Sequence, residues 1–232
     1  MNELLLVAEA VVCTLLVVVT WKFAQARLYA IITIFLILIA NLGGKIIEVF
    51  GHVTNTGNIF YASVFLATYF LIERRGKREG IYSIWVAVIG VAFFFVLVQL
   101  TVAMVGSPAT GTLNYALSTA YSPFSQITAA SLIAYVLSQN LNVYLYIYLK
   151  EKFNGAHLWV RANASSVLAQ IVDSIVFFTI AFWGVVPPSN IWDILITGFS
   201  IKVIFIAVTS PLLYLNKIEQ EDGHDFSRIS IR

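Results

Sequence analysis

The feature that most constrains this chain is a series of long apolar runs, most of them about 20 residues long and separated by short polar segments. A helix of about 20 residues can cross the ~30 Å hydrocarbon layer of a bilayer, whereas a transmembrane barrel strand needs about half that length and alternates polar with apolar residues. The chain is 59% hydrophobic and only 11% charged, and soluble domains average about 25% charged residues. We therefore predict an all-α, polytopic membrane helix bundle.

Seven membrane spans can be drawn from these runs. They are predicted at Glu3–Phe23, Leu28–Phe50, Asn58–Ile72, Ile81–Val105, Pro123–Leu149, Ala162–Trp183 and Ile191–Leu215. The first run carries Glu9 and lacks both a basic start and a small-residue cleavage pattern, so we interpret it as a retained helix and not as a signal peptide. Residues 1–216 are thus expected to form a single transmembrane domain, followed by a polar cytoplasmic tail at 217–232.

Lysine and arginine residues are distributed unevenly between the two sides of these spans. With the N-terminus outside, twelve of the fourteen lie in the inner segments or the C-terminal tail, and the other two, Lys45 and Lys202, lie within spans. The outer segments 51–57, 106–122 and 184–190 contain none. Because cytoplasmic segments are enriched in these residues, the pattern predicts an N-out, C-in orientation with seven spans.

Polar side chains at membrane depth are costly unless they are paired or hydrated, so they are the candidates for function. Asn41, Lys45 and Glu48 follow one another at spacings of four and three, and we expect them to share one face of the second span. An alternative interpretation is that Lys45 and Glu48 form a local pair near the outer interface. Asn41, Gln126 and Gln170, with their amide groups, can also simply link helices by hydrogen bonds.

The sixth span contains the stretch RANASSVLAQIVDS, from Arg161 to Ser174. We interpret Arg161 as an anchor at the cytoplasmic end of this span, followed by small residues that allow close helix packing. Gln170 and Asp173 are three residues apart and share a face, which we expect to line an internal polar cavity near the membrane midplane. Asp173 can also form a structural ion pair with Lys202 of the seventh span, although buried pairs of this kind seldom add stability.

The stretch from Arg161 onward, RANASSVLAQIVDSIVFFTIAFWG, resembles the signature of the queuosine precursor transporter family, also called the vitamin-uptake-like transporter family. In that signature a basic residue, a small-polar pair, an amide and an aspartate precede an aromatic run. The stretches IANLGGKIIEVFG and ITAASLIAYVLSQNLNVYLYIYLKEK agree, and the resemblance covers roughly residues 28–216. The family often has acidic residues where this chain has Thr68-Tyr69 and Asn142. Its core has six spans, so residues 1–27 are expected to be an extra N-terminal helix on a six-helix core at 28–216.

This resemblance implies a transporter, not an enzyme, that imports a 7-deazaguanine base such as 7-cyano-7-deazaguanine, a precursor of queuosine or archaeosine. The pyrimidine edge of such a base presents two adjacent donors, which suit a bidentate carboxylate, and we expect Asp173 to accept them. Lys45 or Lys202 would supply a positive charge opposite this carboxylate. The predicted substrate-binding residues are Asn41, Lys45, Gln126, Gln170, Asp173 and Lys202, with Tyr69 and Phe178 as candidates for stacking on the ring.

The sequence contains no GxxxxGK[ST] phosphate-binding loop, so the chain is not expected to hydrolyse ATP. We expect a stand-alone secondary transporter or facilitator in the cell membrane. One alternative is the substrate-binding subunit of an ATPase-driven vitamin-type system, and another is a seven-helix retinal protein that uses Lys202. Cys13 is the only cysteine and the three histidines are far apart, so no metal or cofactor is expected. The expected partners are a small-molecule substrate and lipid but no nucleic acid, and a homodimer is left open.

Overall fold

The computed structural model describes residues 1–23, 27–43, 45–121, 124–182 and 188–215. The helices are α1 (Asn2–Phe23), α2 (Leu28–Leu42), α3 (Gly57–Arg75), α4 (Lys77–Ala103), α5 (Gly111–Tyr121), α6 (Phe124–Lys152), α7 (Leu158–Phe182) and α8 (Pro188–Thr209). Two short 3₁₀ helices, η2 (Pro108–Thr110) and η3 (Ser210–Tyr214), and two strands, β1 (Ile46–Val49) and β2 (His52–Asn55), complete the described elements. The predicted tail at 217–232 lies outside the described residues.

Long apolar helices dominate this arrangement. Four segments of the described chain are long and apolar enough to cross a membrane, and α2 is a shorter apolar helix. The four are Asn2–Phe23, Lys77–Ala103, Ala129–Lys152 and Leu195–Tyr214. The predicted class, an all-α membrane protein, is therefore confirmed.

Helix α3 lies at the centre of the bundle. Almost every residue from Gly57 to Ile72 is buried, and α1, α2, α4 and α8 all pack against this helix. A helix surrounded by protein has no stripe that faces lipid, so it can carry hydroxyl groups that form hydrogen bonds with neighbouring helices. Tyr61 and Tyr69 of α3 form such bonds with side chains of α6 and α7.

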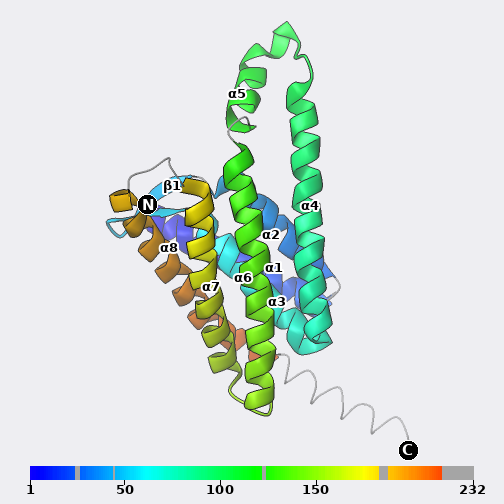
Figure 1. The fold of residues 1–232 in the computed structure, drawn as a ribbon, viewed down its shortest axis with the longest axis vertical. Coiled ribbons are helices and arrows are strands. Elements are labelled where there is room, and N and C mark those ends of the chain that lie inside the picture. Colours follow the sequence, from blue (N-terminus) through cyan, green and yellow to red (C-terminus); the bar gives the residue numbers. More distant parts are fainter. Residues whose placement is uncertain (24–26, 44, 122–123, 183–187, 216–232) are drawn as a thin grey trace, which may run out of the picture.

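Helices α4 and α6 extend past the other helices at one end, where η2 and α5 connect them (Figure 1). The predicted outer segment 106–122 therefore contains helical structure. On this part of α4, Phe93, Leu97 and Leu100 are each more than half exposed. Exposed apolar side chains of this size on a long helix suit contact with lipid.

The predicted helix through residues 28–50 was wrong in its last third. Helix α2 ends at Leu42, and β1 and β2 form an antiparallel hairpin in which Val49 pairs with His52. The two turn residues, Phe50 and Gly51, have φ values of +53° and +77°, as a two-residue hairpin turn with positive φ at both positions requires. A hairpin here, after the glycine pair that follows Leu42, moves the side chains of residues 45–48 off the face of α2.

The N-terminal helix α1 packs closely on α3. Its residues Cys13, Val17 and Trp21 are buried, and the Trp21 ring lies 5.0 Å from the ring of Phe70. The spacing of these residues places them on one stripe of α1, while the opposite side of the helix exposes leucine and valine. Helix α1 is thus an integral part of the described bundle.

Candidate functional site

Asp173 lies in α7 among polar side chains that come from three other helices. Its Oδ1 accepts hydrogen bonds from the Tyr61 hydroxyl of α3 at 2.5 Å and from the Ser138 hydroxyl of α6 at 3.3 Å. Its Oδ2 lies 3.5 Å from Nζ of Lys202 in α8. Asp173 is only 8% exposed and Lys202 only 7%. The carboxylate is therefore buried but surrounded by groups that stabilise its charge.

Unpartnered polar groups occur close in sequence to Asp173 in α7 and to Ser138 in α6. Gln170, one turn before Asp173, is fully buried, and neither its amide oxygen nor its amide nitrogen has a hydrogen-bond partner. The Tyr135 hydroxyl and Nε2 of Gln139 in α6 are also buried without a partner. The Tyr135 ring packs edge-on against Tyr61, with 6.5 Å between the ring centroids. Each such group costs about 1–3 kcal/mol when left unsatisfied, which is typical of a site that awaits a polar ligand.

Lys202 balances the charge of Asp173, but the Asp173 carboxylate keeps free capacity to accept hydrogen bonds. The distance of 3.5 Å between Nζ and Oδ2 exceeds the roughly 2.7–2.9 Å of a charge-assisted hydrogen bond. The ammonium group also lies 4.9 Å from the centroid of the Tyr61 ring, within range of a cation–π contact. Oδ2 can therefore accept donors from a ligand while Lys202 balances the charge.

A second ionic centre lies where the end of α3, the end of α6 and the start of α7 meet. Oε1 of Glu73, near the end of α3, accepts a hydrogen bond from the Tyr146 hydroxyl at 3.0 Å. The same oxygen lies 3.1 Å from Nζ of Lys150 and 3.5 Å from Nη1 of Arg161. The sequence analysis interpreted Arg161 as an anchor at the end of a span, but the structure buries this side chain completely, over the ring of Tyr146.

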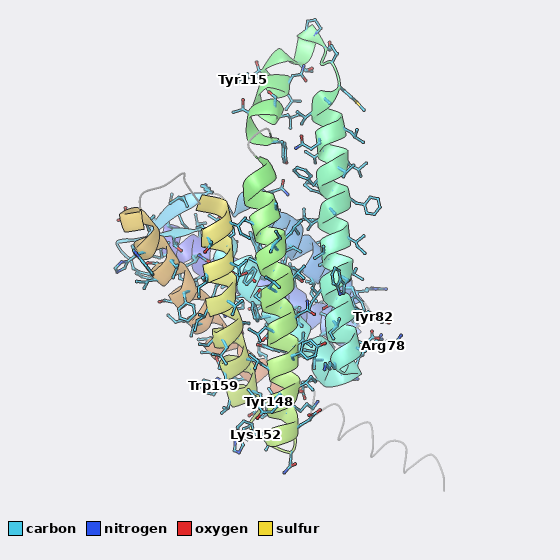
Figure 2. The ribbon with its side chains drawn as sticks, viewed as in Figure 1. Arg78, Tyr82, Tyr115, Tyr148, Lys152 and Trp159 are labelled. Atoms are coloured by element: carbon cyan, nitrogen blue, oxygen red, sulfur yellow. The ribbon has the colours of Figure 1, made fainter. Side chains whose placement is uncertain are left out.

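This end of the bundle, which we call the basic end, gathers basic and aromatic side chains. Arg78, Tyr82, Tyr148, Lys152 and Trp159 all lie toward it, far from Tyr115 of α5 (Figure 2). Arg78 donates hydrogen bonds to the Tyr82 hydroxyl. Tyrosine, tryptophan and basic side chains are enriched where helices leave the hydrocarbon layer.

The predicted face of Asn41, Lys45 and Glu48 does not exist, because α2 ends at Leu42. Lys45 and Glu48 are exposed beside and on the hairpin. Asn41 is half-buried; its Nδ2 donates to the carbonyl of Ile37, and its Oδ1 has no partner. The structure thus pairs Asp173 with Lys202, with the buried Gln170 one helical turn before Asp173, and leaves Lys45 in an exposed position.

The predicted stacking residues give a mixed outcome. Tyr69 is buried, and its ring already stacks on Tyr146 with 4.7 Å between centroids. The side chains of Gln126 and Phe178 lie outside the described residues. The aromatic ring in contact with Asp173 is instead Tyr61, which the sequence analysis missed. A signal for it was present, because Tyr61, Tyr69 and Glu73 recur at multiples of four residues along α3.

No group of three or more His, Cys, Asp and Glu side chains that could hold a metal ion occurs in the part of the chain that the structure describes. The groups around Asp173 offer hydrogen bonding and charge pairing. The site can bind a small polar molecule that presents donors to a carboxylate and both a donor and an acceptor to an amide.

The family model described as "Putative vitamin uptake transporter" matches residues 55–216, a range that includes both ionic centres. The chain belongs to this family of membrane transporters. It is also similar to a protein of Bacillus subtilis (strain 168) named "Probable queuosine precursor transporter", with 31% identity over 180 residues, which cover 75% of this chain and 76% of that protein. No solved structure matches.

Membership of the vitamin uptake transporter family settles the class of protein. The chain is a multi-pass protein of the cell membrane that transports a small molecule and is not an enzyme. The retinal-protein alternative for Lys202 is thereby excluded. The match begins at residue 55, so α1, α2 and strand β1 precede the part of the chain that the family model covers.

Proposed function

We propose that this chain imports a free 7-deazaguanine base, such as 7-cyano-7-deazaguanine, as a stand-alone secondary transporter or facilitator. The observation that carries the proposal is the buried carboxylate of Asp173 one turn away from the unpartnered amide of Gln170. The name of the Bacillus subtilis relative supports the same class of substrate.

The hydrogen-bonding groups of such a base complement these two side chains. Its pyrimidine edge carries two adjacent N–H donors, at N1 and at the exocyclic amine, which suit the two oxygens of Asp173. The neighbouring edge of a free base carries the acceptor N3 beside the donor N9–H, and an amide offers the matching pair of groups. Side chains three residues apart on a helix lie about 5–6 Å apart at Cβ, so Gln170 and Asp173 can read adjacent edges of one molecule.

This pairing favours a free base over its nucleoside. In a nucleoside N9 carries the sugar and has no hydrogen to donate, so the amide oxygen of Gln170 would lose its partner in a buried site. The rings of Tyr61 and Tyr135, both buried near Asp173, supply flat apolar surface for the base. The remaining predicted binding residues, Asn41, Lys45 and Gln126, and the stacking candidates Tyr69 and Phe178 gain no such support.

We further propose that the chain crosses the membrane seven times, with the N-terminus outside and the basic end in the cytoplasm. The seven helices α1, α2, α3, α4, α6, α7 and α8 coincide with the seven predicted spans apart from the hairpin. The clustering of basic side chains at one end supports the orientation. Imported substrate would then travel from the Asp173 site toward the basic end.

Uptake into proteoliposomes that contain only this protein tests the proposal. We expect radiolabelled 7-cyano-7-deazaguanine to enter without ATP or any second protein, and Asp173→Ala to abolish entry while the protein remains folded. Thermal unfolding with a panel of ligands should show stabilisation by free deazaguanines but not by their nucleosides or by vitamins. Near-normal uptake by Asp173→Ala would remove the assignment, and a requirement for an added ATPase would favour the subunit alternative.

A further inference from the structure

The two ionic centres are separated by the same number of residues in three helices. Twelve residues separate Tyr61 from Glu73 in α3, Ser138 from Lys150 in α6, and Arg161 from Asp173 in α7. At 1.5 Å per residue, this spacing corresponds to about 18 Å along each helix. The Asp173 centre and the Glu73 centre are therefore two layers of one three-helix interface.

Buried polar side chains lie between these layers. The Tyr69 hydroxyl donates to Oδ1 of Asn142 at 2.7 Å and lies 3.0 Å from the Ser165 hydroxyl. Nδ2 of Asn142 in turn lies 3.4 Å from Oε1 of Gln139. These four residues come from α3, α6 and α7, and all are fully buried. We call them, together with Gln170, the polar seam.

We propose that Glu73, Arg161 and Lys150 form a gate that closes the polar seam at the basic end. In this role they act on the path by which substrate leaves the Asp173 site, and they do not bind substrate in the closed state. The proposal rests on the transport function that the family establishes and on the site at Asp173, but not on which substrate is carried.

The incomplete pairing of the Arg161 guanidinium indicates a side chain that can be either paired with Glu73 or released from it. Its guanidinium is fully buried, yet none of Nε, Nη1 and Nη2 makes a hydrogen bond, and its ion pair with Glu73 is 3.5 Å long. A well-paired arginine would meet a carboxylate through two shorter hydrogen bonds. Here the contacts of Lys150, Tyr146 and Arg161 all fall on a single oxygen, Oε1 of Glu73. Arg161 is thus held in place but incompletely satisfied, as expected of a contact that breaks and re-forms.

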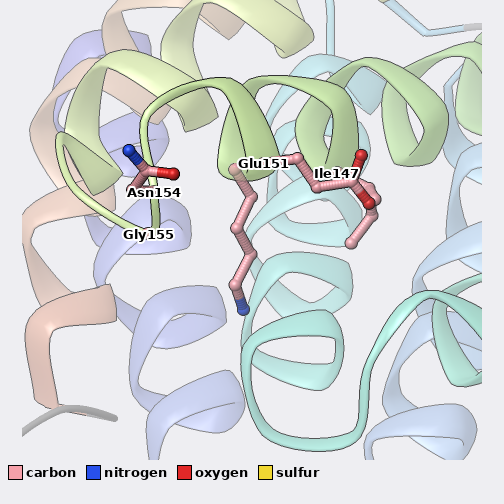
Figure 3. Close-up of a pocket in the computed structure, with 5 residues that line it drawn as sticks. Ile147, Glu151, Asn154 and Gly155 are labelled. Carbon is pink, nitrogen blue, oxygen red and sulfur yellow. The ribbon is translucent and has the colours of Figure 1, made fainter.

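A depression of about 490 Å³ lies outside this cluster. It is lined by Ile147, Lys150, Glu151, Asn154 and Gly155, at the end of α6 and the loop that follows (Figure 3). Lys150 lines the depression and also contacts Glu73, so it stands between the seam and the solvent. Its side chain is 34% exposed, whereas that of Glu73 is 8% exposed. Release of Lys150 and Arg161 from Glu73 would join the seam to the depression.

The gate can be tested with a cysteine reporter inside the seam. In a Cys13→Ser background, Ser165→Cys places a thiol at a position that the gate should protect from a water-soluble thiol reagent. Glu73→Gln removes the charge that holds both cations, and we expect it to raise the rate of labelling about tenfold, as when a minor open state rises from about 1% to about 10%. Arg78→Gln is the matched control, because it removes a basic side chain at the same end that bonds to Tyr82.

Further variants separate a gate from a purely structural role. Lys150→Gln, at a partly exposed position, should also raise labelling and serves if Glu73→Gln does not fold. Labelling at the parent rate in folded Glu73→Gln or Lys150→Gln would overturn the proposal. If no deazaguanine binds but labelling responds as described, only the substrate assignment fails and the gate remains.

Discussion

Replacement of Gln170 by methionine should stabilise the empty protein and weaken binding. Gln170 is fully buried in α7, and both polar atoms of its amide lack a partner. Methionine has a similar volume and no strong hydrogen-bonding group, so the core stays filled while two unsatisfied groups disappear. Replacing a buried side chain seldom raises the stability of a protein, and here the gain is expected only because the Gln170 amide is unsatisfied.

The size of the effect follows from the cost of burying unsatisfied groups. At about 1–3 kcal/mol for each unsatisfied atom, the variant should gain at least about 2 kcal/mol of unfolding free energy. For a chain of this size about 1 kcal/mol corresponds to about 2–4 °C, so the melting temperature should rise by about 4–8 °C. Loss of two hydrogen bonds to the ligand, each worth about 0.5–1.5 kcal/mol, should weaken binding by about 5- to 150-fold.

Thermal unfolding in detergent, with and without 7-cyano-7-deazaguanine, measures both effects in one experiment. Asn163→Met is the matched control on the same helix, because Nδ2 of Asn163 donates to the Trp159 carbonyl and the Ser210 hydroxyl. This control should lower the melting temperature and leave ligand binding unchanged. The reasoning is refuted if Gln170→Met destabilises the protein as much as Asn163→Met does, or if it binds the ligand like the parent.

Three further predictions concern the Asp173–Lys202 ion pair, the hairpin turn and the packing of α1. Asp173→Asn leaves the buried Lys202 ammonium unpaired, and Lys202→Met leaves the buried Asp173 carboxylate unpaired, so each should lower the free energy of unfolding by about 3–5 kcal/mol. The double variant should lose less than the sum of the two. Additive losses in a double-mutant cycle would contradict this. Gly51→Ala should cost about 1–2 kcal/mol of unfolding free energy because φ at this position is +77°; no atom lies close enough to add a steric clash. Gly111→Ala, at an equally open position with helical φ, should be neutral or slightly stabilising. Equal melting temperatures for the two variants would argue against the hairpin turn. Trp21→Ala should cost about 3–5 kcal/mol in thermal unfolding, and a loss below about 1 kcal/mol would mean that α1 is only loosely attached.

The sequence was informative wherever the signal is local. The length of an apolar run depends only on consecutive residues, so most of the long helices could be located, although α5 and the end of α2 were not. The shared face of Gln170 and Asp173 follows from helical spacing alone. The ion pair between Lys202 and Asp173 could be predicted only as one of several options, because the packing of the helices decides which of them are neighbours.

The hairpin and the second ionic centre could not be predicted for physical reasons. The turn is formed by Phe50 and Gly51, and phenylalanine is not among the residues that mark such turns, so the apolar run appeared to continue as helix. Glu73 stands beside Arg74 and Arg75, which made it resemble part of a solvated charged segment. Its burial against Arg161 depends on contacts between residues that are far apart in the sequence.

The enclosure of α3 has a consequence for biosynthesis. This helix is the most thoroughly buried of the described chain, yet it is absent from the four segments that meet the length and apolarity needed to cross a membrane. A segment of this kind gains little by partitioning alone from the translocon into lipid. We therefore expect α3 to enter the bilayer together with the strongly apolar α4, which follows it after a single residue, Gly76. In nascent chains that end between the two helices, α3 itself should remain outside the bilayer.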